Sequence, residues 1–231
     1  VPSRPASSHP VLRIRELLYA LIFASAISGA MLVARSAYAE KARFTGLFGN
    51  LLLAWIPLVL AIVAERLRTV PVPPRQWIWF CRVLWLLFFP NALYIVTDLI
   101  HIKKFGLDGV PRWFDFFLIM GHAAVGIFLG CLSLYLIEGA VRARWGRRAG
   151  LGFAAGILAL GSFGIYLGRF VRLNSWDILI RPFKVVTDVA ALAHPTKAGE
   201  LAAFSTTFFF FSLAMYALVV ATAKSHQPPV S

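Results

Sequence analysis

Six apolar runs, each close to the length needed to cross a bilayer, limit what this sequence can fold into. They lie at about 17–33, 44–64, 76–101, 113–137, 150–170 and 202–223. A hydrocarbon core about 30 Å thick is crossed by about 20 helical residues, because each residue advances an α-helix by about 1.5 Å. Backbone polar groups in lipid must be satisfied within the segment, which favours helices. The sequence therefore predicts an all-α membrane bundle of about six transmembrane helices.

The composition excludes an ordinary soluble domain. Hydrophobic residues make up 59% of the chain, charged residues 14%, and the mean hydropathy is +0.75, whereas soluble domains are roughly 45–50% apolar and about 25% charged. The net charge of +13 falls in clusters between the apolar runs, a placement typical of contact with anionic lipid head groups. We therefore predict membrane lipids as partners and no binding to nucleic acid.

The chain is predicted to form one membrane domain with two short ends. Residues 1–12 are expected to be a disordered or partner-bound arm, 13–223 the transmembrane domain, and 224–231 a polar tail. Between the fifth and sixth runs, the stretch SWDILIRPFKVVTDVAALAHP alternates apolar and charged residues and predicts an interfacial segment. Small residues four apart in the fifth run favour close helix packing.

The charges predict two different ends for the bundle. An even number of spans places both termini on one side, and basic residues are evenly divided between the sides. The dense cluster RARWGRR lies on the terminal side, which favours cytoplasmic termini. Seven of the ten acidic residues fall on the opposite side: Glu40, Asp98, Asp108, Asp115, Asp177, Asp188 and Glu200.

A candidate polar site lies on that acidic side, where several spans end in polar residues. Asp98 and His101 are three residues apart, so they share one face of a helix. Such residues form either an interhelical network or a substrate or catalytic site. In the network, Arg169 or Arg172 neutralises one of the carboxylates of Asp98, Asp115 and Asp177. A metal site is disfavoured, because the group holds a single histidine. The candidate set is Asn91, Asp98, His101, Asp115, Arg169, Arg172, Asn174, Trp176 and Asp177.

His122 lies well inside the fourth run, within IMGHAAVG. Its imidazole is able to hydrogen-bond a backbone carbonyl, or to ligate a haem or chlorophyll with Gly121 and Gly126 leaving room for a flat ring. Haem sites in bundles usually use a second histidine at matching depth, and the other four histidines lie in loops or near the interfaces. The hydrogen-bonded interpretation is therefore favoured, and the sequence requires no cofactor.

Familiar catalytic signatures are missing from the sequence. It contains no GxSxG elbow, no GxxxxGK[ST] loop and no CxxC pair. Few ionisable residues occur inside the runs and no internal repeat is evident, which argues against a transporter. Whether the chain is an enzyme is left open by these observations.

Five segments extend from the second run to the loop after the fifth. They are NLLLAWIPLVLA (50–61), LWLLFFPNALYIVTDLIH (84–101), PRWFDFFLI (111–119), LGCLSLYLIE (129–138) and FGIYLGRFVRLNSWDIL (163–179). Together they resemble a family of bacterial membrane proteins that share a domain of unknown function, DUF1361. The resemblance implies a multi-pass protein of the bacterial cytoplasmic membrane and implies no reaction. His122 lies outside the five segments.

Three functions are compatible with these features. The favoured hypothesis is a non-catalytic accessory or assembly subunit of a larger respiratory, photosynthetic or transport complex, with other membrane subunits as partners. The second is a membrane enzyme or binding protein whose polar site acts on a lipid-linked or extracytoplasmic substrate. The third is a pigment- or haem-binding subunit that uses His122.

Overall fold

The computed structural model describes residues 10–39, 41, 43–173 and 177–225, and these residues form helices without any strand. This confirms the predicted all-α membrane fold. The long helices coincide with the apolar runs, since helices satisfy their own backbone in lipid. In chain order the elements are α1 (Pro10–Tyr38), α2 (Gly46–Arg68), α3 (Arg75–Tyr94), the 3₁₀ helix η1 (Ile95–Lys104), α4 (Arg112–Tyr166), the π-helix η2 (Leu167–Val171), α5 (Asp177–Ile180), α6 (Pro182–Ala190), the 3₁₀ helix η3 (Ala191–Ala193) and α7 (Pro195–Ser225).

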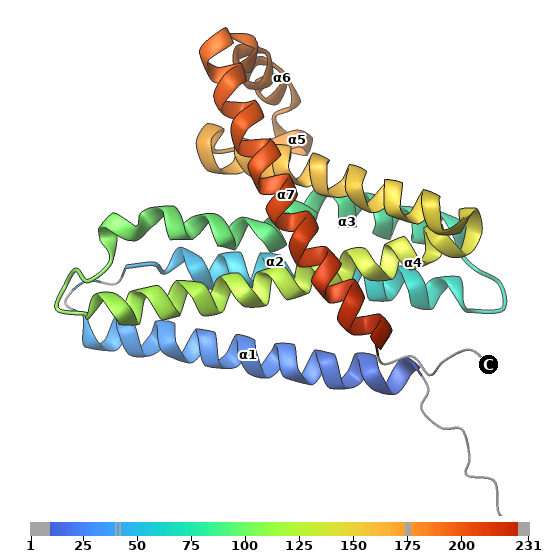
Figure 1. Cartoon of the computed structure of the whole chain (residues 1–231), viewed down its shortest axis with the longest axis horizontal. Helices are drawn as coiled ribbons and strands as arrows, with labels where there is room; N and C mark the ends of the chain where they lie inside the picture. The colour runs from blue at the N-terminus through green and yellow to red at the C-terminus, as the bar shows by residue number, and fades with distance from the viewer. Residues whose placement is uncertain (1–9, 40, 42, 174–176, 226–231) are drawn as a thin grey trace, which may run out of the picture.

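Five of the described helical segments are long and apolar enough to cross a membrane, and one of them doubles back. This segment, Arg112–Val171, contains 60 residues, and a straight helix of that length would extend about 90 Å, roughly three times a bilayer core. At Gly146 the backbone leaves the helical region, with φ 84° and ψ 172°, and the chain reverses direction there (Figure 1). The predicted fourth and fifth spans are the two arms of α4 on either side of Gly146.

The bundle has two ends that differ in what they hold. The described chain begins in α1 and finishes in α7 at the same end, which also holds the reversal at Gly146 (Figure 1). We call this the terminal end. The opposite end, where α1 and η1 finish and residues 43–45 and the loop 105–111 lie, is called the polar end.

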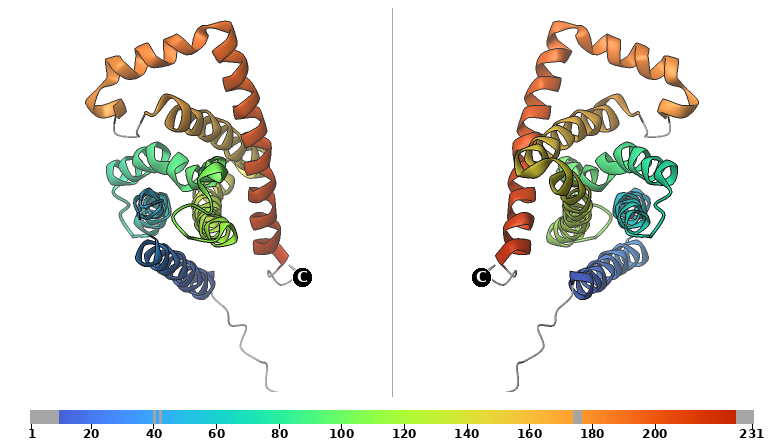
Figure 2. Two further views of the ribbon diagram at one scale, coloured as in Figure 1. Left: turned by 90° about the vertical axis from the view of Figure 1, so that its left-hand side faces the viewer. Right: turned by 90° about the vertical axis from the view of Figure 1, so that its right-hand side faces the viewer.

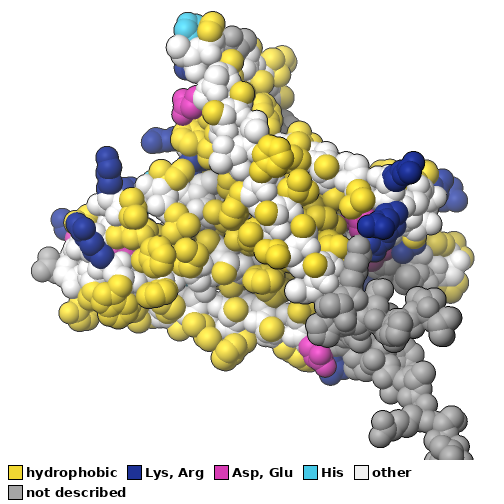
Figure 3. Space-filling view, viewed as in Figure 1, with side chains coloured by type: hydrophobic (Ala, Val, Ile, Leu, Met, Phe, Trp, Pro, Cys, Tyr) yellow, Lys and Arg dark blue, Asp and Glu magenta, His cyan; other side chains and the backbone are white. Residues whose placement is uncertain are grey.

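The helices α2, α3 and α4 form the centre of the bundle, and α1 and α7 lie outside it (Figure 2). The apolar parts of α1 and α7 are the least buried of the five segments. In the face drawn in Figure 3, hydrophobic side chains cover the middle and most visible Lys and Arg side chains lie toward the ends. This distribution fits a bundle whose waist is surrounded by lipid tails.

Glycines allow α3 and α4 to approach each other closely. A Cβ atom built on Gly126 would lie 2.4 Å from the carbonyl oxygen of Ala92, and one on Gly161 would lie 3.1 Å from the ring of Phe89. Gly164 and Gly168 likewise face α3, whereas Gly152 has no atom within 4 Å of its Cβ position. The predicted close packing by glycines of the fifth run thus holds for its second half.

The segment between η2 and α7 stands away from the bundle. In Figure 2, α6 projects beyond the main group of helices and joins α7, which then crosses α4 and packs against it (Figure 1). Ile180, Phe183 and Val186 follow each other at intervals of three residues, and each is at least two-thirds exposed. Lys184 pairs with Asp188 at 2.6 Å. An exposed apolar row beside a charged pair agrees with the predicted interfacial segment.

We expect replacement of Gly126 by alanine to destabilise the bundle by about 1–3 kcal/mol, the usual cost of overpacking a dense interior. The added methyl group would collide with the backbone of α3 at Ala92. Gly152→Ala is the matched control on the same helix: it should be neutral or stabilising by up to about 1 kcal/mol, since alanine is the better helix former. Unfolding in mild detergent measures both, and equal effects would contradict the assigned contact.

Candidate functional site

Arg169 is the centre of the candidate site at the polar end. Its Nη2 donates a hydrogen bond to Asp98 Oδ1 at 2.5 Å, and its Nε donates one to Thr97 Oγ1 at 2.8 Å. The guanidinium also lies 4.4 Å from the centre of the Tyr94 ring, a cation–π contact. The side chains of Arg169 and Asp98 are only 10% and 11% exposed. This is one of the pairings that the sequence predicts, and it gives two poorly solvated charges the partner that each needs.

The change from α3 to η1 places Asp98 and His101 above each other. A 3₁₀ helix has three residues per turn, so side chains three apart are eclipsed. Arg169 reaches both residues, because its Nη1 also lies 3.2 Å from His101 Nε2. A guanidinium is only a donor, so His101 Nε2 accepts this bond and the neutral ring carries its proton on Nδ1.

A hollow of about 270 Å³ opens beside this network, between the first turn of α2 and η1. On the α2 side, Asn50 Nδ2 donates to Asp98 Oδ2 at 3.2 Å, so both oxygens of Asp98 are engaged. The volume is slightly below the roughly 300–1,000 Å³ of pockets for drug-sized ligands, which suits a small ligand. The lining residues are Arg43, Phe44, Gly46, Leu47, Asn50, Asp98, His101 and Lys104.

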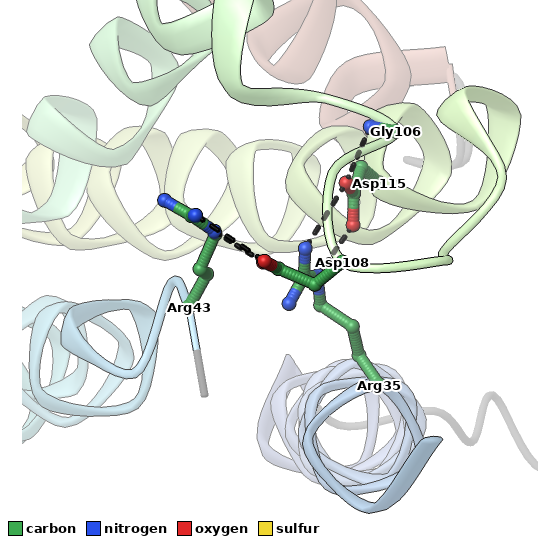
Figure 4. Close-up of polar contacts among 5 residues, drawn as sticks. All are labelled: Arg35, Arg43, Gly106, Asp108 and Asp115. Atoms are coloured by element: carbon green, nitrogen blue, oxygen red, sulfur yellow. Dashed lines mark hydrogen bonds and ion pairs between the residues drawn. The ribbon is translucent and has the colours of Figure 1, made fainter. Parts of the chain in front are cut away.

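A buried ion pair fixes the end of α1 and the loop 105–111 at this end of the bundle (Figure 4). Arg35 Nε lies 2.6 Å from Asp115 Oδ1 and its Nη2 lies 3.3 Å from Oδ2, and neither side chain is exposed. The backbone N–H of Gly106 donates to Asp115 Oδ2 at 2.9 Å. Asp115 therefore ties the end of α1 and the loop 105–111 to the beginning of α4.

The same end contains strained backbone beside the hollow. Phe44 has φ 61°, an uncommon conformation for a bulky residue, and the Arg35 guanidinium lies 4.9 Å from the centre of its ring. Asp108 also has φ 61° and is bound by Arg43 (Figure 4). The hydrogen bond from Arg43 lowers the pKa of the Asp108 carboxyl below its usual value. Strained residues of this kind often lie at functional sites.

The structure brings three members of the candidate set together, namely Asp98, His101 and Arg169. Asp115 is at the same end but has Arg35 as its cation. Of the other members, Asn91 donates to the Phe88 carbonyl at 3.2 Å, Arg172 ends η2 with φ 64°, and Asp177 begins α5. Asn174 and Trp176 lie outside the described residues.

His122 is fully buried in α4. Its Nδ1 lies 2.8 Å from the Leu118 carbonyl, the backbone hydrogen bond that the sequence analysis favours. Its Nε2 has no hydrogen-bond partner among the described residues. The space that Gly126 was expected to leave for a flat ring is occupied by the Ala92 carbonyl. Ligation of a haem or chlorophyll by His122 stays a prediction.

Several residues of this end were missing from the predicted set, among them Arg35, Arg43, Asn50 and Lys104. Asn50 could have been predicted from the sequence, because a polar side chain in the second apolar run requires a hydrogen-bond partner. Arg35 follows the predicted end of the first run, where a basic residue is ordinarily solvated. Its burial depends on the three-dimensional packing of α1 against α4.

A family model described as a protein of unknown function (DUF1361) matches residues 50–219, which is most of the chain and includes most of α2 and all of α3, η1 and α4. The resemblance noted in the sequence is thereby confirmed. Asp98, His101 and Arg169 lie within the matched part, whereas Arg35 and Arg43 precede it. No curated protein and no solved structure matches the chain.

Loss of the Asp115 charge should destabilise the protein by about 3–5 kcal/mol, because it leaves the buried Arg35 cation unpaired. Asp115→Asn tests this with little change in shape, by unfolding in detergent. The control is Lys184→Ala, which removes an exposed pair with Asp188 and should cost less than about 1 kcal/mol. A double variant, Arg35→Met with Asp115→Leu, should recover much of the loss, and an unchanged stability of Asp115→Asn would refute the assignment.

Proposed function

We propose that this chain, which belongs to the family of proteins of unknown function DUF1361, is a multi-pass membrane protein that binds a small anionic ligand at its polar end. The observation that carries the proposal is the hollow of about 270 Å³ beside the Arg169–Asp98 pair. In the bacterial cytoplasmic membrane with cytoplasmic termini, this end would face the extracytoplasmic side. The ligand would be a free molecule of that compartment or the polar part of a lipid-linked one.

The charge of the lining favours an anion. Arg43 and Lys104 contribute two cations, and Arg169 neutralises the carboxylate of Asp98 from behind. Asp108 neutralises Arg43, so the positive charge that no carboxylate of the lining balances is that of Lys104. Asn50 and His101 add polar groups to the wall, which supports hydrogen bonding to a ligand that carries hydroxyl or carbonyl groups.

The hydrogen bonds of Asp98 favour a preformed binding site. Both Asp98 oxygens already accept hydrogen bonds, one from Arg169 and one from Asn50. His101 Nε2 is likewise occupied by Arg169. These contacts hold the floor of the hollow rigid, as expected of a preformed binding site.

Filling the hollow tests the proposal without disturbing the network. Gly46 lines the hollow and has no atom within 4 Å of its Cβ position, so Gly46→Phe should fold normally while its ring occupies the ligand space. Gly49→Phe is the matched control, because Gly49 is equally open but does not line the hollow. Gly46→Phe should abolish rescue of a strain that lacks the gene, at unchanged membrane level and melting temperature, and Gly49→Phe should rescue fully. Full rescue by Gly46→Phe would rule out this hollow as the functional site.

A second proposal, that the chain is an accessory subunit of a larger membrane complex, is supported by the projecting segment around α6. Phe183 is 86% exposed, and the neighbouring apolar residues Ile180 of α5 and Val186 of α6 are also exposed. A row of large apolar side chains held away from its own bundle suits contact with a neighbouring subunit, as well as with lipid. The expected partners are other membrane-protein subunits of a respiratory, photosynthetic or transport assembly.

Co-purification distinguishes a neighbouring subunit from lipid as the contact of the exposed apolar residues Ile180, Phe183 and Val186. Phe183→Glu should remove a partner subunit that co-purifies with the wild-type protein in mild detergent. Val72→Glu introduces the same charge at an equally exposed apolar residue (86%) in the α2–α3 loop, so it should retain the partner. A wild-type protein that purifies alone, or equal retention by both variants, would leave lipid as the occupant and refute the accessory role of this row.

A further inference from the structure

A second hollow, of about 450 Å³, lies at the terminal end where α4 reverses. Its volume is within the range usual for small-molecule sites. The two arms of α4 and the last part of α7 converge on it, so it is built from three separate parts of the chain. Its lining consists of Glu138 and Arg142 from the first arm, Arg147 and Leu151 from the second, and Tyr216 and Val220 from α7.

Two buried polar side chains of this hollow lack hydrogen-bond partners within the described part of the protein. They are Glu138, 3% exposed, whose Oε2 is unsatisfied, and Tyr216, 4% exposed, whose hydroxyl is unsatisfied. An unsatisfied buried polar group costs about 1–3 kcal/mol, and more when it is charged. Native proteins retain such groups when a ligand or an ordered water satisfies them. These atoms therefore point to an occupant that supplies a hydrogen-bond donor.

The position of Glu138 is enforced by the turn that follows it. A Cβ atom on Gly150 would lie 2.3 Å from Glu138 Oε1, so the second arm approaches the carboxylate with its bare backbone. On the other side, Arg142 Nη1 lies 3.4 Å from Glu138 Oε2, an ion pair longer than a hydrogen bond of ideal length. The carboxylate is thus held at the wall of the hollow with one oxygen only partly compensated.

Cations surround the same opening. Arg142 is about one-third exposed, and Arg147 is exposed beside it. Figure 3 shows Lys and Arg side chains gathered at this end of the molecule. Arginine guanidinium groups bind phosphate oxygens through paired, charge-assisted hydrogen bonds. The hollow combines two phosphate-binding groups with a carboxylate and a phenol that require hydroxyl partners.

We propose that this hollow is a binding site for the head group of an anionic phospholipid that carries free hydroxyls, such as phosphatidylglycerol. Its phosphodiester lies between Arg142 and Arg147, and its hydroxyls donate to Glu138 Oε2 and to the Tyr216 oxygen. Leu151 and Val220 complete the lining with apolar surface, and Leu151 is half exposed. This apolar wall favours a membrane lipid, whose chains continue along it, over a soluble phosphate ester. Basic pockets between transmembrane helices bind anionic lipids in this way.

The site is tested on the full chain in mild detergent by native mass spectrometry. Phosphatidylglycerol, phosphatidic acid and phosphatidylcholine with identical chains are titrated separately, and glycerol 3-phosphate is used as a soluble competitor. The wild type should prefer phosphatidylglycerol. Arg142→Gln and Arg147→Gln should each weaken its binding about tenfold, as expected for one lost charge-assisted contact. Tyr216→Phe should reduce the preference for phosphatidylglycerol over phosphatidic acid, because it removes one of the two hydroxyl partners and leaves Glu138 Oε2.

Arg144→Gln is the matched control, since Arg144 belongs to the same basic cluster and stacks on Trp145 without lining the hollow. Its affinity should stay within about twofold of the wild type. If Arg142→Gln fails to fold because it breaks the pair with Glu138, Arg147→Gln still decides the outcome. Equal binding of phosphatidylglycerol and phosphatidylcholine, or equal losses in Arg147→Gln and Arg144→Gln, would overturn the site. Competition by glycerol 3-phosphate at the concentration of the lipid would overturn its assignment to a lipid.

Discussion

The ion pair between Arg35 and Asp115 is the interaction on which the polar end depends. Both side chains are fully buried, and in a medium of low dielectric constant neither charge is tolerated alone. The pair does more than join α1 to α4. Asp115 also accepts the Gly106 N–H, and Arg35 lies over the ring of Phe44. Phe44, which lines the polar-end hollow, and the loop 105–111 are therefore both held by a single pair of charges.

The buried polar side chains that line the two hollows differ in whether their hydrogen bonds are complete. At the polar end, Arg169 and Asn50 engage both oxygens of Asp98. At the terminal end, the described residues leave Glu138 Oε2 and the Tyr216 hydroxyl without a hydrogen bond. Both oxygens of Asp98 are engaged before any ligand binds, so a ligand there meets a preformed wall. Arg35 Nη1, also at the polar end, has no hydrogen-bond partner among the described residues but does not line the hollow. The other hollow is completed by its occupant, which then contributes to the stability of the helices that surround it.

Much of the architecture was predictable, because the bilayer imposes one length scale on every apolar run. The sequence also placed Asp98 and His101 on one face and offered Arg169 as a partner for a carboxylate. It did not identify the cation of Asp115. Hydropathy indicates how deep a residue lies in the membrane but not which way its helix faces. The rotation and packing of α1 place Arg35, and not Arg169 or Arg172, beside Asp115. The hollows likewise depend on distances between helices, which spacing along the chain does not encode.

A glycine near a polar residue in an apolar run indicates either a ligand site or close helix packing. The position of the neighbouring backbone distinguishes the two. Gly126 lies one helical turn from His122, a pattern typical both of a flat ligand and of a closely packed helix. The Ala92 carbonyl occupies the place that a Cβ of Gly126 would take, so this glycine serves the contact between α3 and α4. Gly46 is the opposite case, since nothing lies within 4 Å of its Cβ position and it borders a hollow. A glycine therefore indicates a binding site only where its missing side chain leaves space that no other part of the chain fills.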